Sequence, residues 1–329
     1  METDKMKYLC NIPARREDSH KGTYGKILIA AGSCGMCGAA VFAGLAAYRS
    51  GAGLVRILTH QENRIIIQTM VPEAFYTGYD EHTDFVRLSS DSVSWADVIV
   101  VGPGLGTGGL SVTLLREILN ALIHLSGTEE DAVEAKWLKK SPMLLIDADG
   151  LNILSTHPDL IKKVDTIARW IPVIVTPHAL EMARLSSCSL DDVLTSLPEA
   201  AATFARKHGT VTVMKGAETV IMDAREHAFR NLEPSPALSK GGSGDVLSGA
   251  IAGIYAVLRA DRSEKLSTVK EEQGKKSLWY QMAFDATVTA VLVHAEAGRQ
   301  AARIHGTHAV FARETADMLG IVMEKRGKA

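Results

Sequence analysis

The chain has 329 residues, of which 46% are hydrophobic and 22% charged, and its formal net charge at pH 7 is −2. This balance argues against a nucleic-acid-binding protein, which needs a clustered positive surplus. No apolar run reaches the roughly 18 residues of a membrane span, and residues 1–26 lack an apolar core of signal-peptide length, so we expect a cytoplasmic protein.

Short β-branched runs alternate with longer Ala- and Leu-rich runs along the chain. The short runs are continuously apolar, as expected when helices cover both faces of a mostly parallel sheet. We therefore predict an α/β fold with a single domain over residues 1–329. The predicted strands are 26–31, 54–58, 97–101, 143–146 and 173–176, with a hairpin of 210–214 and 219–222, and the first and last predicted helices are 38–50 and 246–258.

Two charge-rich stretches, residues 126–141 and 261–277, interrupt this alternation. We predict that both are solvent-exposed insertions able to carry short helices, because their charges favour a solvated surface. Neither has the composition of a domain boundary.

Glycine-rich turns follow the predicted strands at residues 32–38, 102–108 and 241–244. Ligands of an open α/β sheet lie beyond the carboxyl ends of the strands, where backbone approaches them closely only if side chains are absent. The three turns therefore predict one large crevice. A standard dinucleotide-binding turn is disfavoured, because Cys34 occupies its second glycine position and the second strand leads to Thr59 and His60, without an acidic residue.

The third turn, Lys240-Gly-Gly-Ser-Gly-Asp245, directly precedes a predicted helix. The N–H groups of Gly242, Ser243 and Gly244 can point into one concavity, where the helix dipole adds positive potential, so the turn predicts an anion-binding nest. Asp245 would lie beside a bound phosphate and could accept a proton from an attacking hydroxyl. The alternative is that Asp245 caps the helix.

Polar clusters follow two neighbouring strands. Asp147 and Asp149 come after one strand, and Thr176, His178 and Glu181 come after the next. Carboxylates at such an edge can bind Mg²⁺ directly or through water, as phosphate chemistry usually requires. Asp149 and Thr176 are equally compatible with helix caps, and His178 with an ordinary loop histidine.

The segment Lys215-Gly-Ala-Glu-Thr219 joins the strands of the predicted hairpin. Its backbone could clasp a nucleotide, or it could be an ordinary hairpin turn.

Cysteines 10, 34, 37 and 188 do not form a disulfide framework in a chain of this length. Cys34 and Cys37 form a C-x-x-C, but no second Cys/His pair has metal-ligand spacing. We interpret the two thiols as small fillers in a glycine-rich turn.

Together these segments resemble the ADP/ATP-dependent NAD(P)H-hydrate dehydratases, a ribokinase-like family, over about residues 19–325. The segments that carry the resemblance occur in the same order: 19–25, 32–40, 49–54, 102–106, 147–149, 176–178 with Glu181, 215–217 and 241–245.

The resemblance implies repair of nicotinamide cofactor damaged by hydration of its reduced ring. By this analogy Asp245 deprotonates the hydroxyl of the S epimer of NADHX or NADPHX, and Gly242, Ser243 and Gly244 stabilise the transferring phosphoryl group. Phosphate is then eliminated and NADH or NADPH is restored. The implied ligand contacts are Ala39, Gly104, His178 and Asp245 for the hydrated dinucleotide; Lys215, Gly216, Ala217, Glu218, Thr219 and Gly244 for ADP or ATP; and Glu181, directly or through water, for Mg²⁺.

The chain departs from the family pattern at Ser235, where asparagine is common, and at Leu180, where glycine is common. The resemblance further implies a homo-oligomer and, since no epimerase domain precedes the segments, a separate epimerase. A vitamin-precursor kinase of the same superfamily and a non-catalytic nucleotide sensor remain alternatives. The sequence does not decide whether ADP or ATP is the preferred nucleotide, or whether NADHX or NADPHX is the preferred substrate.

Overall fold

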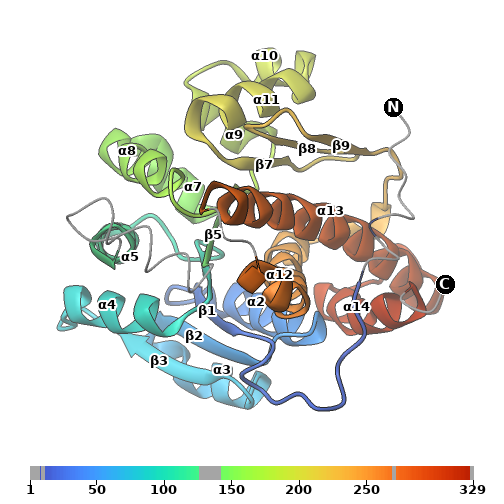
Figure 1. The fold of residues 1–329 in the computed structure, drawn as a ribbon, viewed down its shortest axis with the longest axis horizontal. Helices are drawn as coiled ribbons and strands as arrows, with labels where there is room; N and C mark the ends of the chain where they lie inside the picture. The colour runs from blue at the N-terminus through green and yellow to red at the C-terminus, as the bar shows by residue number, and fades with distance from the viewer. Residues whose placement is uncertain (1–7, 9–11, 126–141, 269–271, 327–329) are drawn as a thin grey trace.

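The computed structural model describes residues 8, 12–125, 142–268 and 272–326, which form a nine-stranded sheet with helices on both faces (Figure 1). The strands are β1 (Lys26–Ala30), β2 (Leu54–His60), β3 (Phe75–Tyr79), β4 (Val98–Val101), β5 (Met143–Ile146), β6 (Val173–Val175), β7 (Val211–Met214), β8 (Thr219–Asp223) and β9 (Ala228–Asn231). The helices are α2 (Cys37–Arg49), α3 (Arg64–Met70), α4 (Phe85–Trp95), α5 (Gly109–Leu125), α7 (Asp149–Thr156), α8 (Pro158–Ile167), α9 (Ala179–Ser186), α10 (Leu190–Thr195), α11 (Leu197–His208), α12 (Ser243–Thr268), α13 (Glu272–His305) and α14 (Ala312–Arg326), with 3-10 turns η1 (Gln61–Asn63) and η2 (Pro236–Leu238).

The strand order is β3-β2-β1-β4-β5-β6-β7-β8-β9. Pairings from β3 across to β7 are parallel, whereas β8 pairs antiparallel with β7 and with β9. The predicted α/β class, mostly parallel sheet and hairpin are therefore confirmed. The edge strands β3 and β9 were not predicted from the sequence.

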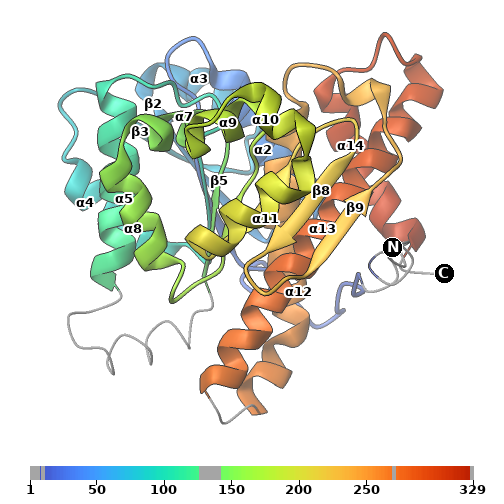
Figure 2. The same ribbon diagram turned by 90° about the horizontal axis from the view of Figure 1, so that it is seen from above.

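The central strands bury side chains on both faces, which explains their continuous apolar sequences. In β1, Ile27 and Ile29 join a core with α2, α12, α13 and α14, whereas Leu28 and Ala30 join the opposite core with α4, α5, α7 and α8. Figure 2 shows these two helix layers on either side of the sheet. Because the strands from β3 across to β7 are parallel, their carboxyl ends all lie at the same edge of the sheet.

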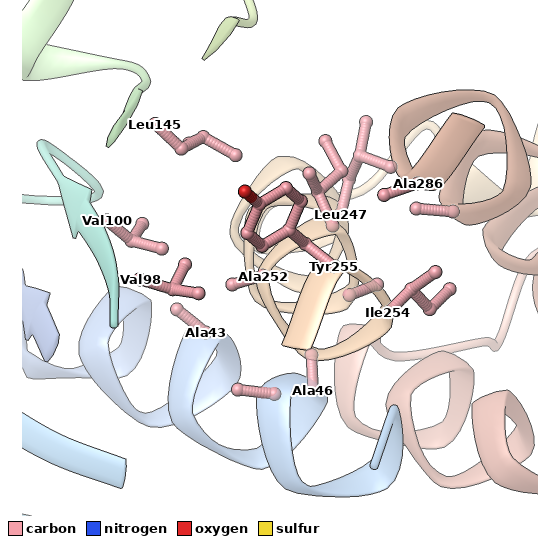
Figure 3. Close-up of a cluster of buried hydrophobic side chains, with 14 of the residues drawn as sticks. Ala43, Ala46, Val98, Val100, Leu145, Leu247, Ala252, Ile254, Tyr255 and Ala286 are labelled. Carbon is pink, nitrogen blue, oxygen red and sulfur yellow. The ribbon is translucent and has the colours of Figure 1, made fainter. Parts of the chain in front are cut away.

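Helix α12 lies at the centre of the first layer, where Tyr255 packs among small and branched side chains of α2, β4 and β5 (Figure 3). Small residues allow α12 to approach α2 closely: a β-carbon built on Gly249 would lie 2.2 Å from the Ala43 carbonyl oxygen. Any larger residue at position 249 would push the two helices apart. This contact fixes the start of α12, which carries Asp245, against α2.

The described residues of the charged stretch 261–277 lie in two long helices rather than in short ones of their own, and the interpretation of this stretch as an insertion stays a prediction. Residues 261–268 continue α12 and residues 272–277 belong to α13, so the charges occupy the ends of two long helices. The other predicted insertion, 126–141, lies outside the described residues. Within the described part of the chain, every helix is too short or too polar to cross a membrane.

Candidate active site

The first two glycine-rich turns are joined by backbone hydrogen bonds. Gly32 N–H donates to the Pro103 carbonyl at 2.9 Å, and Ser33 N–H donates to the Gly104 carbonyl at 2.6 Å. Gly104 has a φ of +56°, and a β-carbon built on it would lie 2.7 Å from that of Ala39. Two residues expected to contact the hydrated dinucleotide, Ala39 and Gly104, therefore lie side by side.

The third turn packs against the helix that follows the first turn. Gly242 has a φ of +92°, and a β-carbon built on it would lie 2.7 Å from the Phe42 ring of α2. Because positive φ and tight packing both favour glycine, glycine is required at position 242. The three turns predicted to share one edge of the sheet are thus brought together.

Asp245 is the third residue of α12, since the helix begins at Ser243 rather than at the predicted position 246. Within the described chain, no hydrogen bond to the Asp245 carboxylate is formed, so the capping alternative is not supported. Burial raises the pKa of Asp245 to about 7, with further contributions from the negative charges of Asp147 and Asp149 that Lys215 partly offsets. A carboxyl group with this pKa can both accept and hold a proton near neutral pH.

The N–H groups of the third turn differ in their hydrogen bonds. Ser243 N–H donates to the Lys240 carbonyl at 3.3 Å, a long and therefore weak bond. Among the described residues, the N–H groups of Gly242 and Gly244 have no backbone acceptor. Two of the three predicted donors are thus available to an anion, and the third would have to give up its bond.

A buried ion pair lies beside this turn. Lys215 Nζ donates to Asp147 Oδ1 at 2.7 Å, and Ser248 Oγ donates to Asp147 Oδ2 at 2.7 Å. Burial alone would raise the pKa of Asp147, but Lys215 and the hydroxyls of Thr176 and Ser248 outweigh it and hold the pKa below its ordinary value. Burial likewise opposes the charge on Lys215, yet the Asp147 and Glu181 carboxylates raise its pKa. Both groups are therefore charged at neutral pH.

A cavity of about 630 Å³ opens between the β7–β8 turn, the segment before α12, and α13. Of the predicted nucleotide contacts, Lys215, Gly216, Ala217, Thr219 and Gly244 line it. Glu218 is absent from the lining, and its carboxylate pairs with Arg230. The further lining residues are His178, Asn231, Glu233, Pro234, Ser235, Pro236, Leu238, Ser239, Lys240, Ser243, Leu247, Val291, His294 and Ala295.

Three side-chain atoms in the cavity wall are buried without a hydrogen-bond partner among the described residues: Ser235 Oγ, Ser243 Oγ and His294 Nε2. Burial lowers the pKa of His294 to about 4, so its imidazole is neutral at pH 7. Unpaired buried polar atoms are rare in folded proteins. They give this cavity hydrogen-bonding capacity, and of the three only His294 was not singled out in the sequence.

His178 and Glu181 form a capping box at the start of α9. Glu181 N–H donates to His178 Nδ1 at 3.2 Å, and His178 N–H donates to Glu181 Oε2 at 2.8 Å. Burial lowers the pKa of His178 and raises that of Glu181, although Lys215 opposes the second shift. Thr176 and Asp149 are not caps, because His178 and Ala148 occupy the N-cap positions. Asp149 Oδ2 instead accepts from Gly106 N–H at 2.8 Å, beside Gly104.

The described carboxylates near the cavity are not arranged to bind Mg²⁺ directly. One Glu181 oxygen is committed to the capping box and Asp147 is paired with Lys215, and the described residues contain no group of three or more His, Cys, Asp or Glu side chains arranged to hold a metal. Mg²⁺ commonly keeps several waters and binds through one or two carboxylates together with substrate phosphates. The residues therefore fit a water-mediated ion that arrives with the nucleotide.

Cys34 is not a packed filler, which corrects the interpretation drawn from the sequence. It is exposed, and its Sγ donates to Glu62 Oε2 at 2.8 Å. Cys37 is half-buried as the first residue of α2. The turn therefore depends on its glycines for shape, and Cys34 ties it to η1.

The sheet and this arrangement of turns define a ribokinase-like α/β protein. A ribokinase-like superfamily protein of solved structure from Enterococcus faecalis superposes with a TM-score of 0.74 at 24% identity, covering 98% of this chain and 95% of that one. The model of the NAD(P)H-hydrate dehydratase family matches residues 27–319, and the chain belongs to that family.

Named relatives agree with this assignment. The chain is 33% identical over 245 residues to the ADP-dependent (S)-NAD(P)H-hydrate dehydratase of Listeria monocytogenes, covering 74% of this chain and 76% of the relative. It is 35% identical over 244 residues to the bifunctional NAD(P)H-hydrate repair enzyme Nnr of Escherichia coli, covering 74% of this chain but only 41% of that enzyme. The chain thus spans less than half of the bifunctional relative. The Bacillus subtilis ADP/ATP-dependent NAD(P)H-hydrate dehydratase, co-crystallised with ATP and Mg²⁺, superposes with a TM-score of 0.71 at 26% identity, covering 98% of this chain and 97% of that one.

Proposed function

We propose that this chain dehydrates the S epimer of hydrated NADH or NADPH, consumes ADP or ATP, and releases phosphate. One observation carries the proposal: Asp245, with a pKa of about 7, interacts with Lys215 at the nucleotide cavity and with Asp149, which binds the turn containing Gly104. These interactions support a proton acceptor that serves both of the sites that the reaction has to connect.

The chemistry follows from the poor leaving-group ability of hydroxide. Asp245 takes the proton of the ring hydroxyl while the hydroxyl oxygen attacks the terminal phosphorus of the nucleotide. An O–P bond forms, the bond to the nucleotide breaks, and AMP or ADP leaves. The ring nitrogen lone pair then expels phosphate, and loss of a proton from the adjacent carbon restores the reduced nicotinamide.

The protein's share of phosphoryl transfer is positioning and charge stabilisation. The Lys215 ammonium and the N–H groups of Gly242 and Gly244 would donate hydrogen bonds to the transferring phosphoryl group and stabilise the negative charge on its oxygens. Ser243 N–H would join them once its long bond to Lys240 opens. The nucleotide itself would lie in the cavity against Gly216, Ala217 and Thr219.

Magnesium would neutralise phosphate charge when bound with the nucleotide. Glu181 is the side chain that the resemblance assigns to it, through water, because its Oε2 is held by the capping box and lies 3.9 Å from Lys215. On the substrate side, Ala39, Gly104 and the exposed face of His178 would contact the hydrated dinucleotide.

The test is the absorbance of reduced nicotinamide after protein, Mg²⁺ and either ADP or ATP are added to S-NADHX. We expect absorbance to rise with stoichiometric release of free phosphate. Phosphate retained on a product that has not been dehydrated would indicate a small-molecule kinase, and nucleotide binding without turnover would indicate a sensor. Family membership favours the dehydratase over both alternatives. The same assay with each nucleotide and with S-NADPHX decides the preferences.

Three accompanying expectations stay predictions: a separate epimerase that supplies the S epimer, a homo-oligomeric state, and a cytoplasmic location. The first is checked by adding R-NADHX to the purified chain, which we expect to leave the R epimer unconsumed.

A further inference from the structure

Asp147 makes two short hydrogen bonds to distant parts of the chain. Its Oδ1 accepts from Lys215 at the end of the hairpin strand β7, and its Oδ2 accepts from Ser248 on α12, both at 2.7 Å. Asp147 is 1% exposed and Ser248 is fully buried. One carboxylate therefore ties the carboxyl ends of β5 and β7 to α12.

This link lies directly beside the anion-binding turn. Ser248 is one helical turn after Gly244 and Asp245, so a restraint on Ser248 is a restraint on the first turn of α12. A β-carbon built on Gly244 would lie 3.7 Å from Lys215 Nζ and 4.0 Å from Asp147 Oδ2. The ammonium, the carboxylate and the turn thus form one compact unit.

Stability alone does not account for this unit. Burying an ion pair costs several kcal/mol of desolvation per charge, and apolar side chains of similar volume often stabilise a fold at least as well. Here the pair keeps a cation, 20% exposed, in the wall of the nucleotide cavity. A charge at that point serves a phosphate ligand, which an apolar substitute could not do.

We propose that Asp147 is a positioning residue for phosphoryl transfer: it fixes the Lys215 ammonium at the cavity and, through Ser248, fixes the turn that carries Gly244 and Asp245. The assignment rests on the proposed function, because it supposes that the cavity binds a nucleotide. Asp147 acts through these residues and touches neither substrate.

Asp147 has a second effect, on the proposed base. Three charged groups from different elements face Asp245: Asp147 at the end of β5, Asp149 at the start of α7 and Lys215 at the end of β7. Burial raises the pKa of Asp245 most, and the negative charge of Asp147 is the next cause. Removing that charge also lets the Lys215 ammonium favour ionised Asp245 more strongly. Both changes lower the pKa of Asp245.

The kinetic test compares Asp147→Asn with wild type. We expect kcat to fall at least about tenfold, because a misplaced ammonium and turn lose alignment. In the plot of kcat against pH, the acid limb should move to lower pH, because the pKa of Asp245 is lowered. The matched control is Asp97→Asn, which also removes a carboxylate paired with an α12 residue, Arg259, but ahead of β4 at the opposite edge of the sheet. The control should lose stability and keep both the pH profile and kcat.

A second measurement needs no substrate. The melting temperature is measured against pH for wild type, Asp147→Asn, Asp245→Asn and the double variant. The difference in melting temperature between a protein with Asp245 and the same protein carrying Asp245→Asn depends on the ionisation of Asp245, and its pH dependence gives the midpoint of that ionisation. We expect a midpoint near pH 7 while Asp147 is present. In the Asp147→Asn background, the midpoint should be lower by about one pH unit or more, because a neighbouring negative charge has been removed.

An unchanged midpoint, or wild-type kcat in a folded Asp147→Asn protein, would overturn the proposal. If Asp147→Asn does not fold, Ser248→Ala is tested instead. This variant keeps the ion pair of Asp147 and Lys215 but loses the link to α12, so kcat should fall several-fold while the midpoint of Asp245 ionisation is unchanged. A wild-type kcat in Ser248→Ala would overturn the proposal. If neither wild type nor any variant turns over S-NADHX, the proposed function is wrong. The midpoints of Asp245 ionisation from the melting curves then still decide the role of Asp147.

Discussion

Gly104 and Ala39 are so close that a β-carbon on Gly104 would lie 2.7 Å from the β-carbon of Ala39. This contact joins the turn after β4 to the first turn of α2, at the point where the hydrated dinucleotide is proposed to bind. Neither Gly104 nor Ala39 lines the cavity proposed for the nucleotide, whereas His178 does. The two ligand sites are therefore separable by mutation.

Gly104→Ala should raise KM for S-NADHX by about tenfold or more, because the new methyl group forces the turn away from α2 and strains a positive φ. Nucleotide affinity, measured by calorimetry, should stay close to wild type. The matched control is Gly108→Ala in the same turn, where a β-carbon meets nothing within 4 Å. Melting curves establish that both variants fold. A folded Gly104→Ala protein that binds S-NADHX normally but has lost the nucleotide would show that the two sites are reversed.

Asp245→Asn tests the proposed base. Removal of a positioned general base should lower kcat by about two to four orders of magnitude. Nucleotide affinity should change much less, because Asp245 is not among the residues that line the cavity. Turnover close to wild type in this variant would refute the assignment.

The sequence predicted the parts of the site that are local. The glycine-rich turns, the strands they follow and the hairpin are short patterns with a direct physical cause, and the structure contains all of them. The start of α12 was placed three residues late, because Gly and Ser are poor helix formers and Asp245 reads as a boundary. The edge strands β3 and β9 escaped detection since Gly78 and Arg230 interrupt their apolar pattern.

The links between turns were beyond prediction from one sequence. Asp147 is 68 residues from Lys215 and 101 residues from Ser248, and no periodicity connects such positions. Only the sheet order, which places β5 and β7 on either side of β6, brings them together. For the stretch 261–277 the limit was different: charge alone does not distinguish the ends of long helices such as α12 and α13 from an insertion with short helices of its own.

The pKa of Asp245 predicts the pH dependence of turnover. The carboxylate accepts a proton only when ionised, so kcat should increase as pH rises through about 7 and level off above it. A profile of kcat against pH, measured with saturating S-NADHX and nucleotide, checks this. A flat profile between about pH 5 and 8 would exclude Asp245 as the base that limits turnover.

The cysteines are expected to be dispensable for chemistry. Serine at position 34 keeps a hydroxyl donor for Glu62, and the thiol of Cys37 occupies a half-buried helix start. Cys34→Ser combined with Cys37→Ser should therefore keep kcat/KM within about threefold of wild type, as for most changes outside a catalytic network. Metal analysis of the purified wild-type protein should find no stoichiometric zinc, and one tightly held zinc per chain would contradict this interpretation.

Asp245 should also lower the stability of the folded protein at alkaline pH. Its pKa is raised to about 7 in the folded state from an ordinary value of 3.8, so the folded protein keeps a proton that the unfolded chain loses between these values. Stability therefore falls as pH rises through this window, and the full penalty applies above about pH 7. The difference in pKa corresponds to at most about 4 kcal/mol.

Asp245→Asn removes this penalty while keeping the shape of the side chain. The variant should melt several degrees above wild type at pH 8, by an amount consistent with a gain of about 2 to 4 kcal/mol, and the advantage should shrink steadily toward pH 4. Melting curves of both proteins across this range give the comparison directly. A variant that is no more stable than wild type at pH 8 would mean that Asp245 ionises in the folded protein without penalty, and its proposed tuning by burial and by Asp147 would then be wrong.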